Sequence, residues 1–562
     1  MSEIDDPSFF FAKNGKESAS SELNATLEAL YNERSYDDNA TGCKFPARKA
    51  WLQQRLQLKD LPEVDCKKYK KTMQKLAPRS ATLVFPSAHI NSPASMFGHT
   101  FLRINSKYKS KLLAYAVNYA ANANPDKENA VLFALKGLFG GYYGQYSLLP
   151  YYEKLKEYRD SEQRDIWEYD LNLTEEEVLR MVNHIWELNG TYSDYFFFSE
   201  NCSYNMLWLL EVARPSLHLR EEFFYQVTPL ESVYVVQKAD LIHSNSFRAS
   251  KRTLLLKYEN IINPNYLHLV KEMLQKQQLI AALSENEEIP LEQKCYLFEA
   301  AIEYLEYSYV KGEIEKENYL TLFHILTTQR AALGQTHSIE IDTPENPLNG
   351  HRAFRTTLGG GYKEGEKLSY LGFRTTYHSL EDSPIGFLRG TQIEFLNLLL
   401  SYNKTQKLDL EYATLISIVS LAQRSEFFSG FSWRMKLGWD REYLEDKSHF
   451  TTRVGFGYSF GNEFAYSYLL LDPLLYVADE VEAGLGLSMG VVLDKYKFTQ
   501  TNIEGTLRRY SQSREQYILN VTQSFRVSQN LQLQAKYNYI NRYNSSKKYS
   551  EERYDLLLNY YF

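Results

Sequence analysis

The C-terminal part of the chain, after His351, is a series of twelve segments in which polar and apolar residues alternate. Each segment has ten or more residues, whereas strands of soluble sheets have about five or six. Successive strand residues point to opposite faces, so each segment has one apolar and one polar face. An apolar face toward lipid and a polar face toward a lumen explain this pattern, which predicts an antiparallel transmembrane β-barrel of about twelve strands over residues 349–562.

The twelve predicted strands are 352–362, 367–379, 390–402, 407–422, 430–442, 449–461, 463–477, 480–493, 497–510, 515–527, 530–543 and 553–562. In the segment 530–543, we expect Leu531, Leu533, Ala535, Tyr537 and Tyr539 to face lipid and Gln532, Gln534, Lys536 and Asn538 to face the lumen.

A soluble antiparallel sandwich would also alternate. Segment length favours the barrel, as does the gathering of Tyr and Phe near segment ends, where aromatic girdles of barrels lie. The final Tyr560, Tyr561 and Phe562 resemble the ending that the assembly machinery of bacterial outer-membrane barrels recognises. An even strand number returns both barrel ends to one side, so we expect the N-terminal domain in the periplasm. The segment 379–390 would then be an unusually long inner loop.

Composition excludes several other classes of protein. The net charge of -7 and a pI near 6.0 argue against a nucleic-acid partner, because such surfaces carry an excess of Lys and Arg. Mean hydropathy is -0.45, and we find no apolar run of the ~18 residues that a transmembrane helix needs. The first residues show no signal peptide, which predicts that an exported chain would be a processed form.

Before the barrel, the periodicity divides the chain into three regions. Residues 1–78 have apolar residues at three- and four-residue spacing, which indicates short helices. Residues 79–245 mix short β-branched and aromatic runs with helical ones and predict an α+β domain. There Thr174 and Glu177 form a helix capping box. Residues 246–348 indicate a helical linker region.

Two segments of the α+β region have the residues for thiol chemistry. A Ser- and Pro-rich loop with Ser95 leads to His99 at the start of a strand, and Asn201 or Ser199 can cap a helix whose first turn holds Cys202. Backbone N–H groups and the helix dipole lower the pKa of a thiol placed there. A nearby imidazole would complete an activated nucleophile. Each residue alone is more often structural, and spacing does not show whether they meet.

The other cysteines predict less by themselves. Cys43 and Cys66 are 23 residues apart and fit either a disulfide in an oxidising compartment or two unrelated buried thiols. Cys295 lies in an apolar helical stretch and is expected in a core. The His and Cys residues show no metal-ligand spacing, so we expect no metal and no cofactor.

The stretches SPASMFGHTFLRI and FFSENCSYNMLWLLE, with CKFPARKAWL near the front, resemble the Lnb-type periplasmic domain family over roughly residues 40–235. That family is named for a bacterial lipoprotein N-acyltransferase and is similar to permuted papain-like thiol hydrolases of the NlpC group. The resemblance implies Cys202 as nucleophile and His99 as general base. It also implies a polar residue on the next strand that orients the imidazole, for which Asn118 is the first candidate and Tyr119 the second.

The same resemblance implies a Cys43–Cys66 disulfide. Asn201, Ser203 and Ser95 are the candidates to line the oxyanion or the substrate. The named acyltransferase is held by membrane helices, and here a barrel would take their place.

These features predict an outer-membrane-anchored periplasmic cysteine acyltransferase or hydrolase that acts on lipid or lipoprotein acyl groups. The expected partners are outer-membrane lipid, the lipid or lipoprotein substrate, and the barrel-assembly machinery. A peptidoglycan amidase or endopeptidase with the same Cys–His pair, acting on peptidoglycan peptide, is the alternative enzyme. A non-catalytic barrel channel or envelope assembly protein is the alternative of another class.

Overall fold

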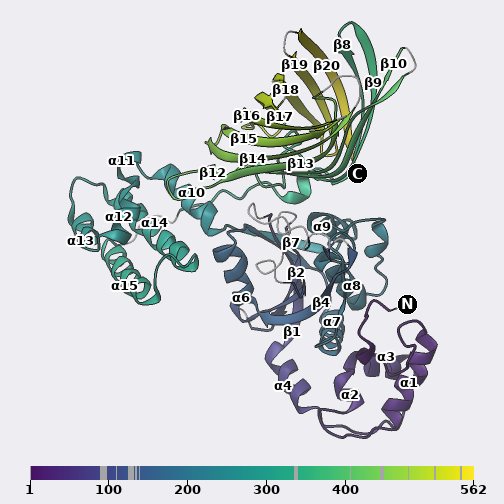
Figure 1. Ribbon diagram of the computed structural model, residues 1–562. Helices are drawn as coiled ribbons and strands as arrows, with labels where there is room; N and C mark the ends of the chain where they lie inside the picture. Colours follow the sequence, from purple (N-terminus) through teal and green to yellow (C-terminus); the bar gives the residue numbers. More distant parts are fainter. Residues whose placement is uncertain are drawn as a thin grey trace. The chain divides into compact units, whose positions relative to one another are not determined.

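The computed structural model describes residues 2–88, 98–108, 110–123, 132, 136–137, 139–334, 339–404, 407–443, 448–478, 480–511, 514–544 and 547–562. These residues form two compact units (Figure 1). The first contains residues up to 252, drawn in purple and blue, and the second contains residues 253–562, in teal, green and yellow. No helix among the described residues is long and apolar enough to cross a membrane.

The first unit is built on a seven-stranded antiparallel sheet in the order β6-β4-β3-β2-β1-β5-β7. The strands are β1 (Pro78–Pro86), β2 (Phe101–Ser106), β3 (Tyr115–Ala121), β4 (Tyr142–Pro150), β5 (Ile166–Leu171), β6 (Ser193–Tyr195) and β7 (Ile242–Arg248). The central strands are apolar and almost fully buried, because helices cover the sheet.

Helices of the first unit are α1 (Ala19–Tyr31), α2 (Thr41–Lys44), α3 (Pro46–Leu56), α4 (Lys67–Leu76), α6 (Tyr151–Leu155), a π-helical turn (Lys156–Ser161), α7 (Glu175–Glu187), α8 (Cys202–Ala213) and α9 (Pro229–Lys238). Helix α7 begins at the expected capping box: Thr174 Oγ1 accepts from the Glu177 N–H, and the Glu177 carboxylate accepts from the Thr174 N–H. Helix α8 packs on β2 and β3.

The N-terminal helices are joined by a disulfide. Cys43, in α2, is bonded to Cys66, the residue before α4, which confirms the pairing that the family resemblance implied. Trp186 Nε1 of α7 donates to the Cys43 carbonyl oxygen at 2.9 Å. The disulfide therefore lies against the α+β domain and ties the N-terminal helices to it.

The helical region before the barrel contains α10 (Lys251–Ile261), α11 (Pro264–Leu267), α12 (Leu269–Gln275), α13 (Gln278–Glu285), α14 (Leu291–Val310) and α15 (Lys316–Ala332). Its core includes Phe427 and Phe428 from the loop between two barrel strands. Their rings lie 5.4 Å from those of Tyr304 and Tyr307 of α14. This region is thus packed onto the barrel rather than forming a loose linker.

The barrel strands are β8 (Arg355–Lys363), β9 (Glu366–His378), β10 (Thr391–Asn403), β11 (Leu408–Ser420), β13 (Ser432–Asp440), β14 (His449–Gly461), β15 (Ala465–Val477), β16 (Val481–Leu493), β17 (Thr499–Tyr510), β18 (Arg514–Ser528), β19 (Leu531–Asn544) and β20 (Lys547–Tyr561). Each corresponds to one predicted segment. Neighbours pair antiparallel all the way round, with β8 on β20 and β14 on β15, so the twelve-stranded barrel is closed. The two-residue β12 (Gln423–Arg424) adds a short parallel pair to β14.

The two faces of the barrel wall follow the alternation in the sequence. On β15, Leu469 and Leu471 are half exposed on the outside, whereas Leu470 and Asp472 are fully buried. On β19, Gln532 and Gln534 are buried inside, as predicted. A polar interior with an apolar exterior is the arrangement of a barrel whose outer face contacts lipid.

Candidate active site

The nucleophile candidate Cys202 is the first residue of α8, and Asn201 caps that helix. Asn201 Oδ1 accepts hydrogen bonds from the N–H groups of Ser203, at 2.9 Å, and Tyr204, at 3.2 Å. The Asn201 Nδ2 group donates to two backbone carbonyl oxygens, of Phe197 and Val227. The turn before α8 is therefore fixed from both sides, and Cys202 is held in the first helical turn with 6% of its surface exposed.

His99 reaches the same place from the sheet. It lies two residues before β2, and β2 pairs antiparallel with β3, so the beginning of β2 is beside the end of β3. That register brings the His99 Nε2 atom to 2.7 Å from Asn118 Oδ1. An amide oxygen only accepts, so Nε2 carries the proton and Nδ1 is left for the thiol. The three residues meet although 103 positions separate the cysteine from the histidine.

The pKa of Cys202 is lowered and the pKa of His99 is raised, and both shifts favour a thiolate–imidazolium ion pair. Burial raises the pKa of the Cys202 thiol, but the charge and hydrogen bond of His99, the Thr100 N–H and the Ser203 hydroxyl outweigh it and lower the pKa to about 7. Burial lowers the pKa of His99, whereas the Cys202 thiolate and Asn118 raise it by more. A thiolate beside an imidazolium at neutral pH is the activated state of a cysteine nucleophile.

Sequence reasoning missed three side chains that border this pair. The Tyr195 hydroxyl is a hydrogen-bonding neighbour of both the Cys202 backbone N–H and the Cys202 sulfur, and burial raises its pKa, so it stays a protonated donor. The Tyr158 ring is stacked on His99, 5.6 Å between centroids. The Arg164 guanidinium lies over Tyr158, is 2% exposed and has no partner for Nε or Nη1 among the described residues.

Tyr195 belongs to β6 and lies seven residues before Cys202. Only the pairing of Tyr195 with Tyr142 of β4 brings its ring to the site. That contact is between residues distant in sequence, and no local motif marks it.

The other predicted lining residues have different roles. Both N–H groups of the Asn201 amide are bound to backbone carbonyls, so this side chain shapes the turn and has no donor left for an oxyanion. The Ser203 N–H is bound to Asn201, and its hydroxyl is 2.8 Å from Thr100 Oγ1 and 3.8 Å from the sulfur. Ser95 lies outside the described residues. The Tyr195 hydroxyl, whose proton faces the Cys202 sulfur, is better placed than these to hold an oxyanion.

An apolar cavity of about 850 Å³ lies in the first unit, between α1 and α3 on one side and α7 and α8 on the other. Its volume falls within the ~300–1,000 Å³ range of ligand pockets. The lining includes Leu23, Trp51 and Leu179, which are 36%, 53% and 41% exposed, together with Trp208 and Val212 of α8. Helix α8 therefore begins at Cys202 and continues along the wall of an apolar cavity.

In the second unit, an inward-folded loop closes the barrel at the end where β8 starts and β20 finishes. This loop, residues 379–390, connects β9 to β10. The Leu380 carbonyl oxygen accepts from Asn502 of β17, and the Glu381 carbonyl oxygen accepts from Gln532 and Gln534 of β19. Strand β17 is five places from β9 around the barrel, so the loop crosses the lumen. We call it the inner plug.

A second loop extends across the lumen near the other end. Residues 441–443 follow β13, and the Glu442 carbonyl oxygen accepts from Gln516 of β18 and Arg542 of β19. The Glu442 carboxylate pairs with Arg508 at 2.7 Å. Strand β19 lies opposite β13, so this loop also crosses the lumen, and we call it the outer plug.

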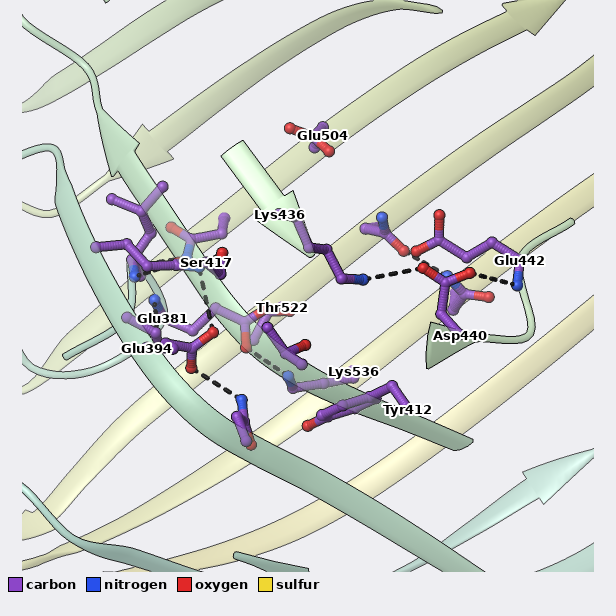
Figure 2. Close-up of a pocket in the computed structure, with 18 of the residues that line it drawn as sticks. Glu381, Glu394, Tyr412, Ser417, Lys436, Asp440, Glu442, Glu504, Thr522 and Lys536 are labelled. Carbon is purple, nitrogen blue, oxygen red and sulfur yellow. Dashed lines mark hydrogen bonds and ion pairs between the residues drawn. The ribbon is translucent and has the colours of Figure 1, made fainter. Parts of the chain in front are cut away.

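Between the two plugs is a polar chamber of about 380 Å³, shown in Figure 2. Glu381 of the inner plug contacts Thr522 and Lys536, and Lys436 pairs with Asp440 at 3.1 Å. Eight basic and eight acidic side chains line the chamber, so its wall has no net formal charge. A lining of this kind favours neither cations nor anions.

Within the described residues, one group of side chains has the spacing of metal ligands: His351, His378 and Asp382. His351 Nε2 is 3.1 Å from His378 Nδ1, so these two atoms share a hydrogen bond. The Asp382 oxygen nearest them accepts from Arg374 at 2.6 Å, and its other oxygen accepts from the Tyr561 hydroxyl at 2.7 Å. The Arg374 guanidinium is already bound to the Asp382 carboxylate. His351, His378 and Asp382 therefore form a hydrogen-bonded cluster that holds the inner plug in place, rather than a cation site.

Comparison with family models adds to this geometry. Residues 68–239 match the Lnb N-terminal periplasmic domain. We refer to this part as the Lnb-like domain. Residues 344–561 match a domain of unknown function (DUF7840), which coincides with the barrel, and residues 1–55 match another (DUF7843). Comparison with curated proteins gave no match.

The barrel is similar to several solved porins. The KdgM porin is 10% identical over 37% of this chain and 99% of its own, with a TM-score of 0.24. The NanC porin is 9% identical over 37% and 100%, with a TM-score of 0.25. An anion-selective porin from Comamonas acidovorans is 9% identical over 37% and 98%, with a TM-score of 0.21. At these scores the similarity carries no argument about function.

The closed barrel and the match of the Lnb-like domain together indicate the cellular location of the chain. The barrel has a lipid-type exterior along its strands, and the matched family is a periplasmic domain. The chain is an outer-membrane protein whose N-terminal domain lies in the periplasm.

Proposed function

We propose that this protein is an outer-membrane-anchored periplasmic cysteine acyltransferase or hydrolase that works through an acyl-enzyme on the acyl groups of lipids or lipoproteins. The observation that carries the proposal is the Cys202 thiol with a pKa of about 7, hydrogen-bonded to a His99 that Asn118 orients. The order of His before Cys supports a permuted papain-like arrangement.

In the proposed reaction the Cys202 sulfur attacks an ester or amide carbonyl carbon and forms a C–S bond. The carbonyl oxygen takes the negative charge next to the Tyr195 hydroxyl, which acts as an oxyanion donor. The His99 imidazolium then gives its Nδ1 proton to the leaving oxygen or nitrogen, and the acyl-enzyme remains. An incoming amine or water loses a proton to His99, attacks the thioester and releases the thiolate.

Two observations support lipid or lipoprotein acyl groups over peptidoglycan peptide. The cavity along α8 is lined by apolar side chains such as Trp51, Leu179 and Trp208, whereas a cell-wall peptide needs a polar groove. The barrel anchor also keeps the Lnb-like domain within reach of membrane lipid.

The two plugs are evidence on the alternative that the barrel is a channel. Both described loops cross the lumen and are bound to the far wall through Leu380, Glu381 and Glu442. A barrel closed at both ends supports a role as an anchor and not as an open pore.

The proposed function is tested by mass measurement of an acyl-enzyme. The full-length protein in nanodiscs is incubated with extracted envelope phospholipids and lipoproteins, or with purified muropeptides, and peptides containing Cys202 are analysed. We expect an added fatty-acyl mass that hydroxylamine removes, formed with the lipid fraction and absent in Cys202→Ser and His99→Ala. A peptidyl adduct would favour the peptidase alternative, and unmodified Cys202 under both conditions would refute the catalytic role.

A further inference from the structure

The edge of the sheet that holds the active site can be traced from strand directions. His99 lies before the first residue of β2, and Tyr108 follows its last residue, so these two mark opposite edges. The antiparallel partner β3 ends at the His99 edge, and β4, antiparallel to β3, begins there. Residues 139–141, directly before β4, and the segment after β6, which pairs with the start of β4, therefore both lie at the catalytic edge.

Two phenylalanines at this edge are strongly exposed. Phe139, three residues before β4, has 79% of its surface exposed, and Phe224 is fully exposed at 104%. The Phe224 loop is placed by the Val227 N–H, which donates to the Phe198 carbonyl oxygen at 2.7 Å, and by Tyr225, whose ring is stacked with that of Phe198. The two exposed rings thus flank the segment that leads into the nucleophile.

The same segment is held from the Phe139 side as well. The Phe197 N–H donates to the Gly137 carbonyl oxygen at 2.8 Å. A side chain at Gly140 would collide with the Phe196 ring, 2.5 Å away, so the backbone there approaches the ring closely. Gly137 and Gly140 thus both contact the segment that leads into Cys202, while the side chain of Phe139 is exposed to solvent.

We propose that this catalytic edge docks on the surface of a lipid bilayer, with Phe139 and Phe224 inserted into the interface. A fully exposed phenylalanine keeps its apolar ring in contact with water, which is unfavourable. Aromatic side chains partition into the interfacial region of a bilayer, where the ring is covered. The barrel keeps the domain at the outer membrane, so a bilayer is always within its reach. The proposal does not depend on the acyl chemistry.

The charges near Phe224 determine whether electrostatic attraction contributes to membrane binding. Glu221 and Glu222 precede Phe224, and both are exposed. Glu222 is ion-paired with Lys238 at 2.7 Å and Glu221 is hydrogen-bonded to His218 at 3.1 Å, so these carboxylates are balanced locally and do not draw the loop to anionic headgroups. Docking by aromatic insertion is consequently expected to persist at high ionic strength, because salt screens charges and leaves apolar transfer in place.

The test is the accessibility of spin labels in the full-length protein. Labels are attached at Phe139→Cys and Phe224→Cys in a Cys202→Ser background, and the protein is reconstituted in phosphatidylethanolamine–phosphatidylglycerol nanodiscs. Tyr108→Cys is the matched control, because Tyr108 is an exposed aromatic residue of the same sheet at the opposite edge. Heat-dependent gel migration confirms that the barrel of each variant is folded, and the urea midpoint of the first unit confirms that the mutated domain is folded.

We expect the labels at 139 and 224 to be severalfold more accessible to oxygen, relative to a water-soluble nickel chelate, than the label at 108, in low and in high salt. Equal ratios at all three positions would overturn the proposal. Labels at 139 and 224 that are shielded from both reagents would also overturn it, since protein and not lipid would then cover the edge.

A second measurement uses the double variant Phe139→Ser/Phe224→Ser, and this measurement rests on the proposed function. We expect it to lose acyl transfer from bilayer-embedded substrate severalfold and to keep the wild-type rate on a water-soluble short-chain ester. Unchanged transfer from the bilayer would contradict the docking surface. Because the spin labels need no turnover, a failure of the proposed chemistry is recognised separately.

Discussion

Replacing His99 by alanine is expected to abolish the low pKa of Cys202. The imidazole is the main group that lowers this pKa to about 7 from the ordinary 9.0, and the burial that raises it would remain. The variant pKa is therefore expected at 9 or above. A rise of two pKa units is roughly 2.7 kcal/mol, and at pH 7 it lowers the thiolate fraction from about one half to about one hundredth, a ~50-fold loss.

The assay is the rate of iodoacetamide alkylation of Cys202 against pH, followed by mass spectrometry on the full-length protein. Buried Cys295 in the same digest is the internal control for unfolding. In the wild type the rate should rise through about pH 7, because the thiol loses its proton there. Enzymatic turnover should then fall at the raised pKa of His99, where the imidazolium is lost. An alkylation profile that His99→Ala leaves unchanged would refute the ion pair.

Three further predictions concern other parts of the molecule. Tyr195→Phe should lower kcat by about 10²-fold or more, as loss of one oxyanion donor does, and leave KM nearly unchanged in steady-state kinetics; an unaltered kcat would remove Tyr195 from the site. The wild-type barrel should give no stepwise conductance in planar bilayers, while a variant in which Gly and Ser replace both the inner plug, residues 379–390, and the outer plug, residues 441–443, should conduct; open channels in the wild type would contradict the plugs. Replacing Cys43 and Cys66 by serine should destabilise the first unit by about 3 kcal/mol from loop-closure entropy, seen as a lower midpoint in urea unfolding; an unchanged midpoint would contradict that contribution.

The barrel was predictable because every strand obeys the same local rule. Residues such as Gln532 and Gln534 face a polar lumen, and their neighbours face lipid, so a two-residue period runs along the strands and is broken locally at irregularities in β10, β11 and β18. The inner plug was not predictable in the same way. Its sequence, residues 379–390, indicates only a long loop, and its position depends on hydrogen bonds to strands that follow more than a hundred residues later.

The residues of the candidate active site also differ in whether the local sequence predicts them. Cys202 and His99 could be proposed from local signals, namely a helix start and a strand start, and Asn118 from its place on the next strand. The contacts of Tyr195 and Arg164 depend on how distant strands pair and on a π-helical turn that ends nearby. Asn201 shows the opposite case: its polar side chain suggested oxyanion binding, but the backbone carbonyls around it use both of its N–H groups.

The anchor at Asp382 links events at the two ends of the barrel sequence. One carboxylate accepts from Arg374, in the second barrel strand, and from Tyr561, the last residue of the final strand. The inner plug therefore gains its full set of bonds only when the first and last strands have met. In a barrel whose first and last strands have not yet paired, this loop would be held by fewer hydrogen bonds. The loop should therefore take up its final position in the lumen only when membrane insertion is complete. The finished barrel should then unfold in a single cooperative transition.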